Sequence, residues 1–530
     1  FIVGFEKADQ PPVLVKLPTA ELGRFVLLPS GEKGHFIAFL DDLVRLSLPA
    51  IFPKKKIKGA WSVKLSRDAD LYIDDEYSGD LLDKIKQGLE ERHVGLPTRF
   101  LYDAAMPKDL LDQVSKALKL SKNDLIPGAR YHNFNDFFAF PNPAGLQELH
   151  YEPMPPLPHP ALENVPSLLA AMQERDYVLH FPYQKFDYVT RFIEEAAADE
   201  QVESVKITLY RVAGKSAVCE ALLKTLEAGK KVTVFIEAKA RFDEESNLQW
   251  GERLEKAGAT VRYSFPGIKV HTKLLLVSRR NAAQSSINNH QSSIHFAYLG
   301  TGNFNEKTAL LYADHALLTA DKRLTDEAAQ VFDLLEGKLL LPKCKHLLVS
   351  PFTLREKFVD MIDREIENAR DGKDAWMVLK MNSLEDKPMA EKLIEASKAG
   401  VKIQLIIRGI CILTPGIAGE TENIEIISIL DRFLEHARVY LFADGGKEKM
   451  YLSSADWMHR NLDRRVEVAF PIYDENLRQE IRQIIDFQLA DNCKARILEE
   501  KNSNSYKKRK SKKFSRILIG DTSPAMRIAS

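Results

Sequence analysis

Two side chains in the stretch 269–305, His271 and Lys273, are suited to chemistry on phosphate groups. They lie at positions i and i+2 of the apolar run KVHTKLLLV, so on a strand both project from the same face. The stretch ends in the turn Gly300-Thr301-Gly302-Asn303, where small residues let backbone N–H groups and the Asn303 amide converge on an anion. A nucleophile, a cation and an anion cradle together predict chemistry at phosphorus.

A second set of similar groups follows later in the chain. His436 and Arg438 precede another apolar run, and Ser453-Ser454-Ala455-Asp456 takes the place of the glycine turn. The preceding segments also correspond, because residues 391–408 (EKLIEASKAGVKIQLIIR) align with residues 221–238 (ALLKTLEAGKKVTVFIEA). Three features that repeat in the same order predict two homologous domains.

The elements that must position these groups alternate between strands and helices. Strands are expected at 204–212, 232–236 and 260–264, and helices at 217–228 and 244–257, the second capped by Asp243. This order is typical of βαβ units, so we expect a mostly parallel sheet covered by helices.

The first part of the chain has a different pattern. Short strand-like runs at 13–17 and 25–28 alternate with helical ones at 81–91 and 107–118, which indicates an α+β domain. Its aromatic segment 130–141 (RYHNFNDFFAFP) is more typical of a packed corner than of a stacking platform. A proline-rich linker begins at residue 153. We therefore expect a head domain at 1–157, domains at 158–342 and 343–500, and a basic tail at 501–530.

Composition limits the class of protein. The 530 residues include 45% hydrophobic and 28% charged residues, with 75 Lys plus Arg balancing 75 Asp plus Glu. No apolar run approaches the ~18 residues that span a bilayer, and no secretion signal is visible. The four cysteines are far apart, which argues against a zinc site and a disulfide framework. A cytoplasmic protein is expected, with peripheral contact to the inner face of the membrane left open.

A competing phosphate motif is weaker. Gly214-Lys215-Ser216 resembles the end of a P-loop, but the first glycine of that motif would fall at Leu209. We interpret these residues as a turn between a strand and a helix.

The duplicated His-x-Lys/Arg strands and their turns resemble the phospholipase D superfamily. The resemblance implies that both histidines meet at one seam, where one imidazole forms a phosphohistidine and the other acts as acid or base. Hydrolytic members carry an Asp five residues after the motif Lys, where this chain has Ser278 and Ala443. This difference disfavours a phosphodiesterase acting on lipid or nucleic acid, which remains the alternative, and favours phosphoryl transfer. A non-catalytic polyphosphate-binding scaffold is a third hypothesis.

A closer resemblance covers nearly the whole chain. The strings SVKITLYRVA, PGIKVHTKL, GTGNFNEKTALLYADHALLTAD and YLSSADWMHRNLDRRVEVA resemble the bacterial polyphosphate kinase family of phosphohistidine type. The resemblance implies an α/β fold with an α+β head and two tandem phospholipase D-like domains. It also implies reversible transfer between ATP or ADP and polyphosphate, Mg²⁺ as cofactor, and a homo-oligomer without a nucleic acid partner. The family's N-terminal helical domain is not matched here.

The resemblance also assigns roles to residues. It implies that His271 is the phosphorylated nucleophile, that His436 is the second histidine, and that Tyr312, Arg408 and His436 contact the nucleotide. Lys273 and Asn303 are expected to bind phosphate. Arg211 and Arg241 correspond to positions that the family associates with magnesium. Because a guanidinium offers only donors, we interpret both as clamps on phosphate oxygens. Tyr298 stands where the family has a histidine, and its role is open.

Overall fold

The computed structural model describes most of the chain, in two compact units, Phe1–Pro153 and Met154–Ser530. The described residues are 1–7, 10–31, 34–67, 97–237, 244–263, 268–281, 293–500 and 503–507. The predicted helix at 81–91, the cap Asp243 and the tail beyond 507 lie outside them. Among the described helices, none has the length and apolar character needed to cross a membrane.

The first unit is an α+β domain, as its mixed pattern predicts. Its strands form three small sheets with the orders β2-β1-β5, β3-β4 and β6-β7-β8. The elements are β1 (Ile2–Phe5), β2 (Val13–Leu14), α1 (Thr19–Leu22), β3 (Phe25–Gly31), β4 (Gly34–Phe39), α2 (Leu40–Ile51), β5 (Ile57–Trp61), β6 (Val63–Arg67), β7 (Pro97–Asp103), α4 (Lys108–Ala117) and β8 (Leu125–Gly128).

The aromatic segment of this unit is packed only in part. Phe137 and Phe140 contact the ring of Phe25, with centroids 5.3 and 5.0 Å apart. Phe134 and Phe138 are instead 76% and 93% exposed. The segment therefore forms a corner on one side and an open apolar surface on the other.

The first sheet of the second unit has the strand order β12-β11-β10-β14-β15-β16-β21, with β9 also pairing with β16. Its strands are β9 (Tyr177–Phe181), β10 (Val202–Leu209), β11 (Lys231–Ile236), β12 (Thr260–Tyr263), β14 (Lys273–Arg280), β15 (Ser293–Gly300), β16 (Tyr312–Thr319) and β21 (Leu434–Glu435). The helices of this repeat are α5 (Leu168–Glu174), α6 (Asp187–Ala198), α7 (Ala217–Glu227), α8 (Glu244–Lys256), α9 (Glu306–Ala309) and α10 (Lys322–Leu335).

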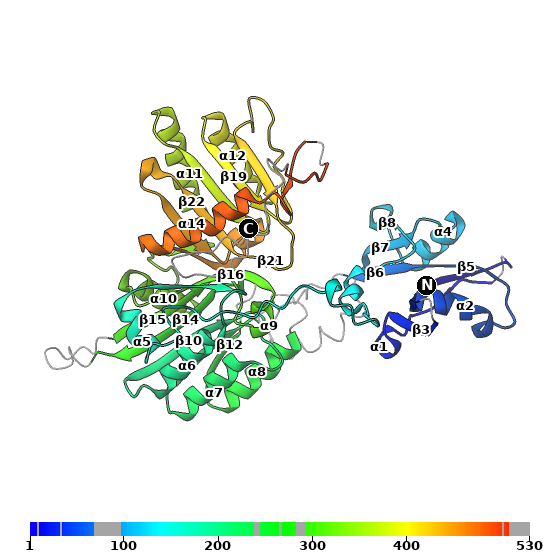
Figure 1. The fold of residues 1–530 in the computed structure, drawn as a ribbon, viewed down its shortest axis with the longest axis horizontal. Coiled ribbons are helices and arrows are strands. Elements are labelled where there is room, and N and C mark those ends of the chain that lie inside the picture. The colour runs from blue at the N-terminus through cyan, green and yellow to red at the C-terminus, as the bar shows by residue number, and fades with distance from the viewer. Residues whose placement is uncertain are drawn as a thin grey trace. The chain divides into compact units, whose positions relative to one another are not determined.

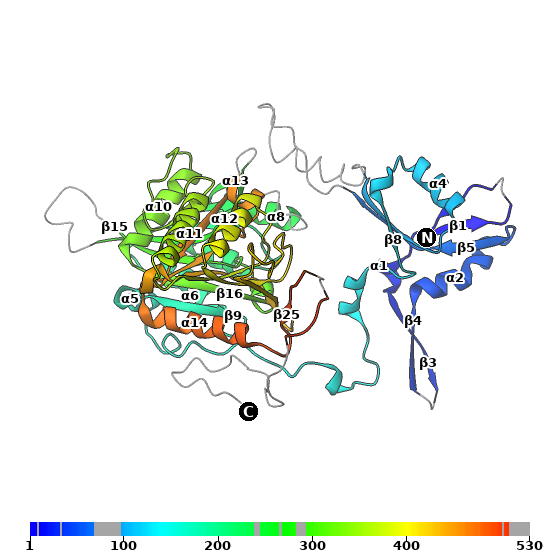
Figure 2. The ribbon, with the colours of Figure 1, turned by 90° about the horizontal axis from the view of Figure 1, so that it is seen from above.

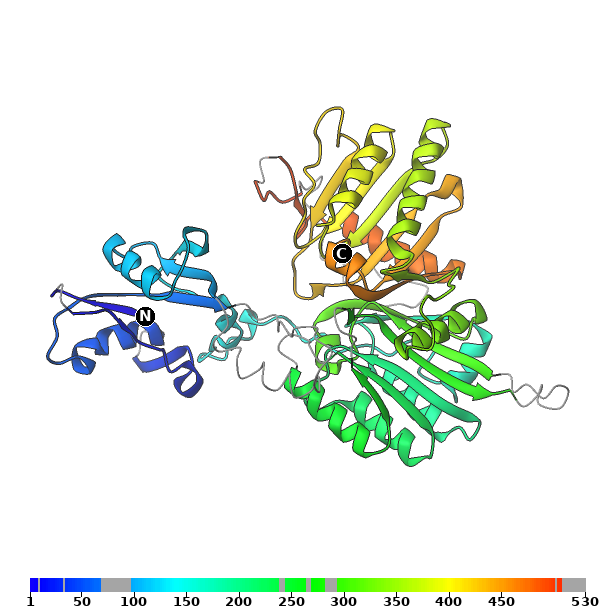
Figure 3. The ribbon, with the colours of Figure 1, turned by 180° about the vertical axis from the view of Figure 1, so that it is seen from behind.

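The second sheet repeats this order as β20-β19-β18-β22-β23-β24, continued by β13, with β17 also pairing with β24. Figures 1 and 3 show the two sheets of this unit with their helices from opposite sides. Its strands are β13 (Lys269–Val270), β17 (Leu348–Ser350), β18 (Trp376–Met381), β19 (Lys402–Ile407), β20 (Ile424–Ser428), β22 (Arg438–Phe442), β23 (Lys449–Ser453), β24 (Arg465–Pro471) and β25 (Arg496–Ile497). The helices are α11 (Leu354–Arg370), α12 (Lys387–Lys398), α13 (His459–Asp463) and α14 (Glu475–Ala490).

The expectation of a mostly parallel sheet is wrong. Only β10, β11 and β12 run parallel to one another in the first repeat, whereas β14, β15, β16 and β9 pair in antiparallel fashion. The second repeat has the same mixture. The physical reason is that the strands after each motif histidine connect directly to their neighbours, without the crossover helix that a parallel pair needs.

Side-chain caps and glycines set the ends of the helices. In the two corresponding helices α7 and α12, the side chains of Ser216 and Asp386 accept a backbone N–H of the first turn. Both helices are followed by a glycine with positive φ, Gly229 at 76° and Gly400 at 94°, a conformation that an L side chain rarely adopts. The aligned Ala-Gly pairs are therefore helix stops.

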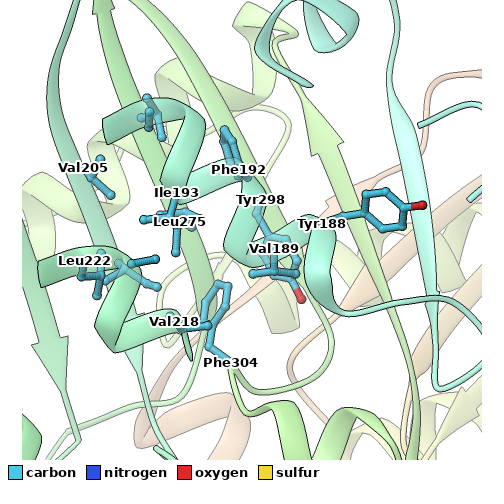
Figure 4. Close-up of a cluster of buried hydrophobic side chains, with 14 of the residues drawn as sticks. Tyr188, Val189, Phe192, Ile193, Val205, Val218, Leu222, Leu275, Tyr298 and Phe304 are labelled. Carbon is cyan, nitrogen blue, oxygen red and sulfur yellow. The ribbon is translucent and has the colours of Figure 1, made fainter. Parts of the chain in front are cut away.

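Three buried clusters form the core of this unit. One lies under helices α5, α6 and α7 and includes Phe192, Tyr298 and Phe304 (Figure 4). Another lies against α11 and α12 of the second repeat. The third is shared, because it joins inner-face residues of both sheets with residues of α10 and α14, such as Leu276, Phe332, Val439 and Ile481. The two repeats therefore bury one continuous interface.

Replacing Phe192 by alanine tests the first cluster. Phe192 is fully buried, so Phe192→Ala should lower the free energy of unfolding by about 3–5 kcal/mol, through lost burial and a residual cavity. Leu340→Ala, at a side chain 93% exposed, should change it by less than about 0.5 kcal/mol. Urea denaturation followed by circular dichroism measures both. Equal effects of the two substitutions would contradict the assignment of Phe192 to the core.

Candidate active site

Each motif histidine is held by a strand that belongs to the sheet of the other repeat. Strand β13 runs directly into His271 and pairs in parallel with β24, and the His271 N–H donates to the Val466 carbonyl at 3.0 Å. Strand β21 runs directly into His436 and pairs in parallel with β16, and the His436 N–H donates to the Ala313 carbonyl at 3.1 Å. The two histidines are thereby placed by a reciprocal exchange of short strands.

His271 is buried against a carboxylate from the second repeat. Its Nδ1 lies 2.8 and 2.9 Å from the two carboxylate oxygens of Glu467, which is completely buried. The ring of Tyr210 meets the imidazole edge-on, with centroids 4.5 Å apart. Burial, followed by the positive charges of Lys273 and Arg465, lowers the pKa of His271 well below its ordinary value. The imidazole is therefore neutral near pH 7.

His436 has the reciprocal arrangement. Its Nδ1 lies 2.9 and 2.8 Å from the carboxylate oxygens of Asp314 in the first repeat. Burial lowers the pKa of His436, and Asp314 opposes that shift. The ring of Tyr312 lies 5.2 Å from the imidazole, and Nη1 of Arg438 lies 3.2 Å from its Nε2.

The two carboxylates are fixed by the same hydroxyl scheme. Thr301 Oγ1 donates to Asp314 at 2.6 Å and accepts the His315 N–H at 3.0 Å. Ser454 Oγ donates to Glu467 at 2.6 Å and accepts the Val468 N–H at 3.0 Å. In both repeats the carboxylate follows the hydroxyl by 13 residues. Sequence reasoning missed Asp314 and Glu467, although this equal spacing after each turn was a signal for them.

The glycine turn has a steric role beside the predicted anion cradle. A Cβ on Gly302 would lie 2.3 Å from Oδ2 of Asp314, and one on Gly300 would lie 2.6 Å from the ring of Tyr298. Tyr298 is 1% exposed and packs on Phe304, so it belongs to the core beneath the turn. Gly302 therefore leaves room for the carboxylate that holds His436.

The predicted cations are brought together only in part. Lys273 is buried and its Nζ donates to the His271 carbonyl, and burial lowers its pKa to about 7. Arg438 pairs with Asp456 at 3.0 Å. Arg408 donates from Nε to Asn382 Oδ1 at 2.7 Å. Arg211 is half-buried at the end of β10, beside the helix cap Asn305. Arg241 lies outside the described residues.

Asn382 and Asn303 complete the site. Asn382 was not predicted as a site residue. Its Oδ1 accepts a hydrogen bond from Arg408 Nε. Its Nδ2 donates to Asp456 at 3.0 Å and to the His436 carbonyl at 3.1 Å. Asn303 Oδ1 is buried without a hydrogen-bond partner, so it offers a free oxygen in the first repeat.

One group of possible metal ligands lies elsewhere within the described ranges. Asp386, His459 and Asp463 bring three ligand atoms within 4.8 Å of one another. Arg355 pairs with both carboxylates, so one of their two negative charges is already balanced. We assign no metal to this group.

Comparisons with known proteins agree along the whole chain. Three families match it: the polyphosphate kinase middle domain over residues 3–140, C-terminal domain 1 over residues 167–340 and C-terminal domain 2 over residues 347–516. The polyphosphate kinase of Vibrio vulnificus (strain YJ016) is 42% identical over 507 residues, covering 94% of this chain and 71% of the relative. That of Escherichia coli (strain K12) is 40% identical over 501 residues, covering 93% and 72%.

A solved structure supports the same assignment. The crystal structure of polyphosphate kinase from Porphyromonas gingivalis superimposes with a TM-score of 0.81 at 37% identity, covering 97% of this chain and 75% of that chain. The α/β class with an α+β head and two related domains is thereby confirmed.

Gly302→Ala tests the steric role of the turn. The added methyl group would displace the Asp314 carboxylate from His436, because it cannot fit at 2.3 Å. We expect a loss of stability of about 1–3 kcal/mol and a shifted imidazole pKa for His436 in an NMR titration. Gly214→Ala is the matched control, since a Cβ there meets nothing within 4 Å and the residue has no positive φ. An unaltered His436 titration in Gly302→Ala would contradict the close approach.

Proposed function

Because this chain belongs to the polyphosphate kinase family, we propose that it reversibly transfers the γ-phosphate of ATP to the end of a polyphosphate chain through a phosphohistidine at His271. The observation that supports the intermediate most directly is the pair of imidazoles, each held through Nδ1 by a carboxylate of the other repeat. This arrangement leaves the Nε2 atom of His271 available for chemistry, whereas Nε2 of His436 faces Nη1 of Arg438 at 3.2 Å.

His271 has the properties of a nucleophile. Its Nδ1–H donates to Glu467, so the lone pair is on Nε2, and the lowered pKa keeps this nitrogen unprotonated. In the first half-reaction Nε2 attacks the γ-phosphorus of ATP, a P–N bond forms, and the bond to the bridging oxygen breaks as ADP leaves. In the second, a terminal oxygen of polyphosphate attacks the same phosphorus and the P–N bond breaks.

His436 is suited to acid–base work toward the oxygens that enter and leave. Asp314 fixes its ring through Nδ1, so a proton can be carried on Nε2. Arg438 and Tyr312 lie beside this histidine, and Arg408 donates to the carbonyl of the preceding residue, Glu435. This proximity supports the proposal that they contact the nucleotide. Lys273 has a pKa of about 7, and a bound phosphate would raise it, so its ammonium form is favoured when substrate binds.

The site fits a divalent cation that is held mainly by substrate. The carboxylates of Asp314, Glu467 and Asp456 are committed to His436, His271 and Arg438, which leaves Asn303 Oδ1 as a free buried oxygen. Mg²⁺ commonly binds through phosphates, waters and few protein ligands. We propose that Asn303 would help to hold Mg²⁺, which would supply positive charge to the phosphate groups, and that Arg211 and Arg241 would clamp phosphate oxygens.

Homo-oligomer formation rests on the family resemblance and remains a prediction. Contact with the inner face of the membrane is left open.

Labelling with γ-labelled ATP tests the phosphohistidine. The protein should acquire an acid-labile, base-stable label with Mg²⁺ present and extend polyphosphate, and His271→Ala should lose the label. His295→Asn is the control, because His295 pairs with Ser278 on the neighbouring strand and takes no part in the site. A label that persists in His271→Ala would exclude this nucleophile. Transfer only to water would favour a hydrolase, and polymer binding without ADP release would favour a scaffold.

Glu467→Gln tests the cross-repeat hydrogen bond. The amide cannot hold the same imidazole tautomer as firmly as a carboxylate, so the rate of phosphoenzyme formation should fall by about 10- to 100-fold. Glu425→Gln, at an exposed position of the same sheet, should leave the rate unchanged. Rapid-quench measurements with labelled ATP compare the two. Equal rates for Glu467→Gln and the parent would show that Glu467 does not orient His271.

A further inference from the structure

A pair of buried histidines lies directly behind the site and takes no part in the chemistry described above. His315 follows Asp314 on β16, so its side chain lies on the opposite face of the strand. Its Nδ1 lies 2.8 Å from Nδ1 of His180, which is opposite it in the register of β9 and β16. The Nε2 atom of His180 lies 3.0 Å from Glu480 on α14. Figure 2 shows α14 next to β9, the strand of His180. The contact therefore joins both repeats next to the carboxylate that holds His436.

The second repeat shows what the fold alone requires at these positions. Strands β17 and β24 correspond to β9 and β16, and their register pairs Val349 with Val468 where the first repeat pairs His180 with His315. Both valines are fully or almost fully buried. Val468 also donates its N–H to Ser454 as His315 does to Thr301. Two valines thus satisfy the same backbone scheme, so packing does not demand the histidines.

The histidine pair is an unusual choice for a buried position. The Nε2 atom of His315 is buried without a hydrogen-bond partner. A buried polar atom without a partner lowers the stability of the folded state, whereas a valine at this position would not. Residues that lower stability in this way are expected mainly at functional sites. A role that depends on a titratable group would explain this cost.

The contact between the two rings depends on their protonation. Facing Nδ1 atoms at 2.8 Å have room for one hydrogen, so one ring donates and the other accepts. A second proton would set two N–H groups and two positive charges against each other. The other titratable groups around the pair are Glu480, His159 and Lys380, and Lys380 is itself paired with Glu435.

The electrostatic surroundings favour the form with one shared hydrogen. Burial, together with the charges of His180 and Lys380, lowers the pKa of His315 well below its ordinary value. Burial opposes ionisation of Glu480, but its hydrogen bond and attraction to His180 lower the pKa of that carboxyl. The pair is therefore intact at neutral pH and weakened by acid.

We propose that His180 and His315 are positioning residues whose contact holds Asp314, and through it His436, and that a second proton on the pair releases this hold. The proposal rests on the proposed function, because it acts through His436. The route is short: Thr301 Oγ1 bonds both the His315 N–H and the Asp314 carboxylate, and Asp314 contacts His436. Activity should then fall in acid more steeply than the chemistry of the site alone requires.

The sequence of the second repeat supplies the test. In His180→Val/His315→Val the valine pair should preserve the fold, with kcat for polyphosphate synthesis near that of the parent at about pH 8. Well below pH 6.5, where the second proton binds to the folded protein, the parent should lose kcat by up to about tenfold per pH unit, and the double variant should lose less. Parallel pH profiles would overturn the proposal. His295→Asn, which lies outside the pair, should follow the parent.

Thermal unfolding gives a second readout that does not depend on turnover. A histidine with a lowered folded pKa contributes stability that is present above its unfolded pKa of about 6.5 and is lost as the pH falls below it. The melting temperature of the parent should therefore fall relative to that of the double variant as the pH is lowered. A constant difference would overturn the proposal.

If the double variant does not fold, Glu480→Gln replaces it. The loss of kcat in acid should then occur at lower pH than in the parent, because the negative charge that favours protonation of the histidine pair is gone.

The same data separate this inference from the proposed function. If the parent makes no polymer from ATP at any pH, the proposed function fails. If the parent is active and the variants share its pH profile, only the positioning role fails.

Discussion

The site depends on the exchange of two short strands between the repeats. Strands β13 and β21 each contribute only two residues, yet each joins the sheet of the other repeat directly before a site histidine. Two-residue strands have little stability of their own, so they are held by the sheets that they join and by the shared core. Neither repeat can therefore build its half of the site alone, because the histidine and the carboxylate that orients it belong to opposite halves.

This dependence has an electrostatic counterpart. The repeats bury His271, Lys273 and Arg438 and half-bury His436, and burial of unpaired charges would be costly. Three carboxylates offset this cost where the repeats meet: Asp314, Glu467 and Asp456. Each accepts a hydrogen bond from a hydroxyl or an amide. These contacts turn the carboxylates toward the two imidazoles and the Arg438 guanidinium. The cations of this seam lie within a protein whose formal net charge is zero.

The sequence predicted what is local and what is repeated. The helices that end at Gly229 and Gly400 and the two histidine strands could be found because their signals lie within short windows or recur in both halves. The partners Asp314 and Glu467 could not, because they meet their histidines across 122 and 196 residues of chain. The antiparallel order was missed for a similar reason: apolar runs show burial but not the direction of the neighbouring strand. Tyr298 proved to be a core residue, which a single position before a turn does not reveal.

The differences between the repeats support the different roles proposed for the two histidines. In the second repeat, the turn ends in Asp456, which forms an ion pair with Arg438 beside His436. In the first repeat the corresponding residues are Asn303 and Lys273, so no carboxylate from the turn faces the ammonium group. The charge of Lys273 is therefore directed to whatever binds at His271, where a transferred phosphoryl group carries negative oxygens. The turn thus leaves Lys273 without the carboxylate partner that Arg438 has, and this asymmetry supports the proposal that His271 carries the phosphate.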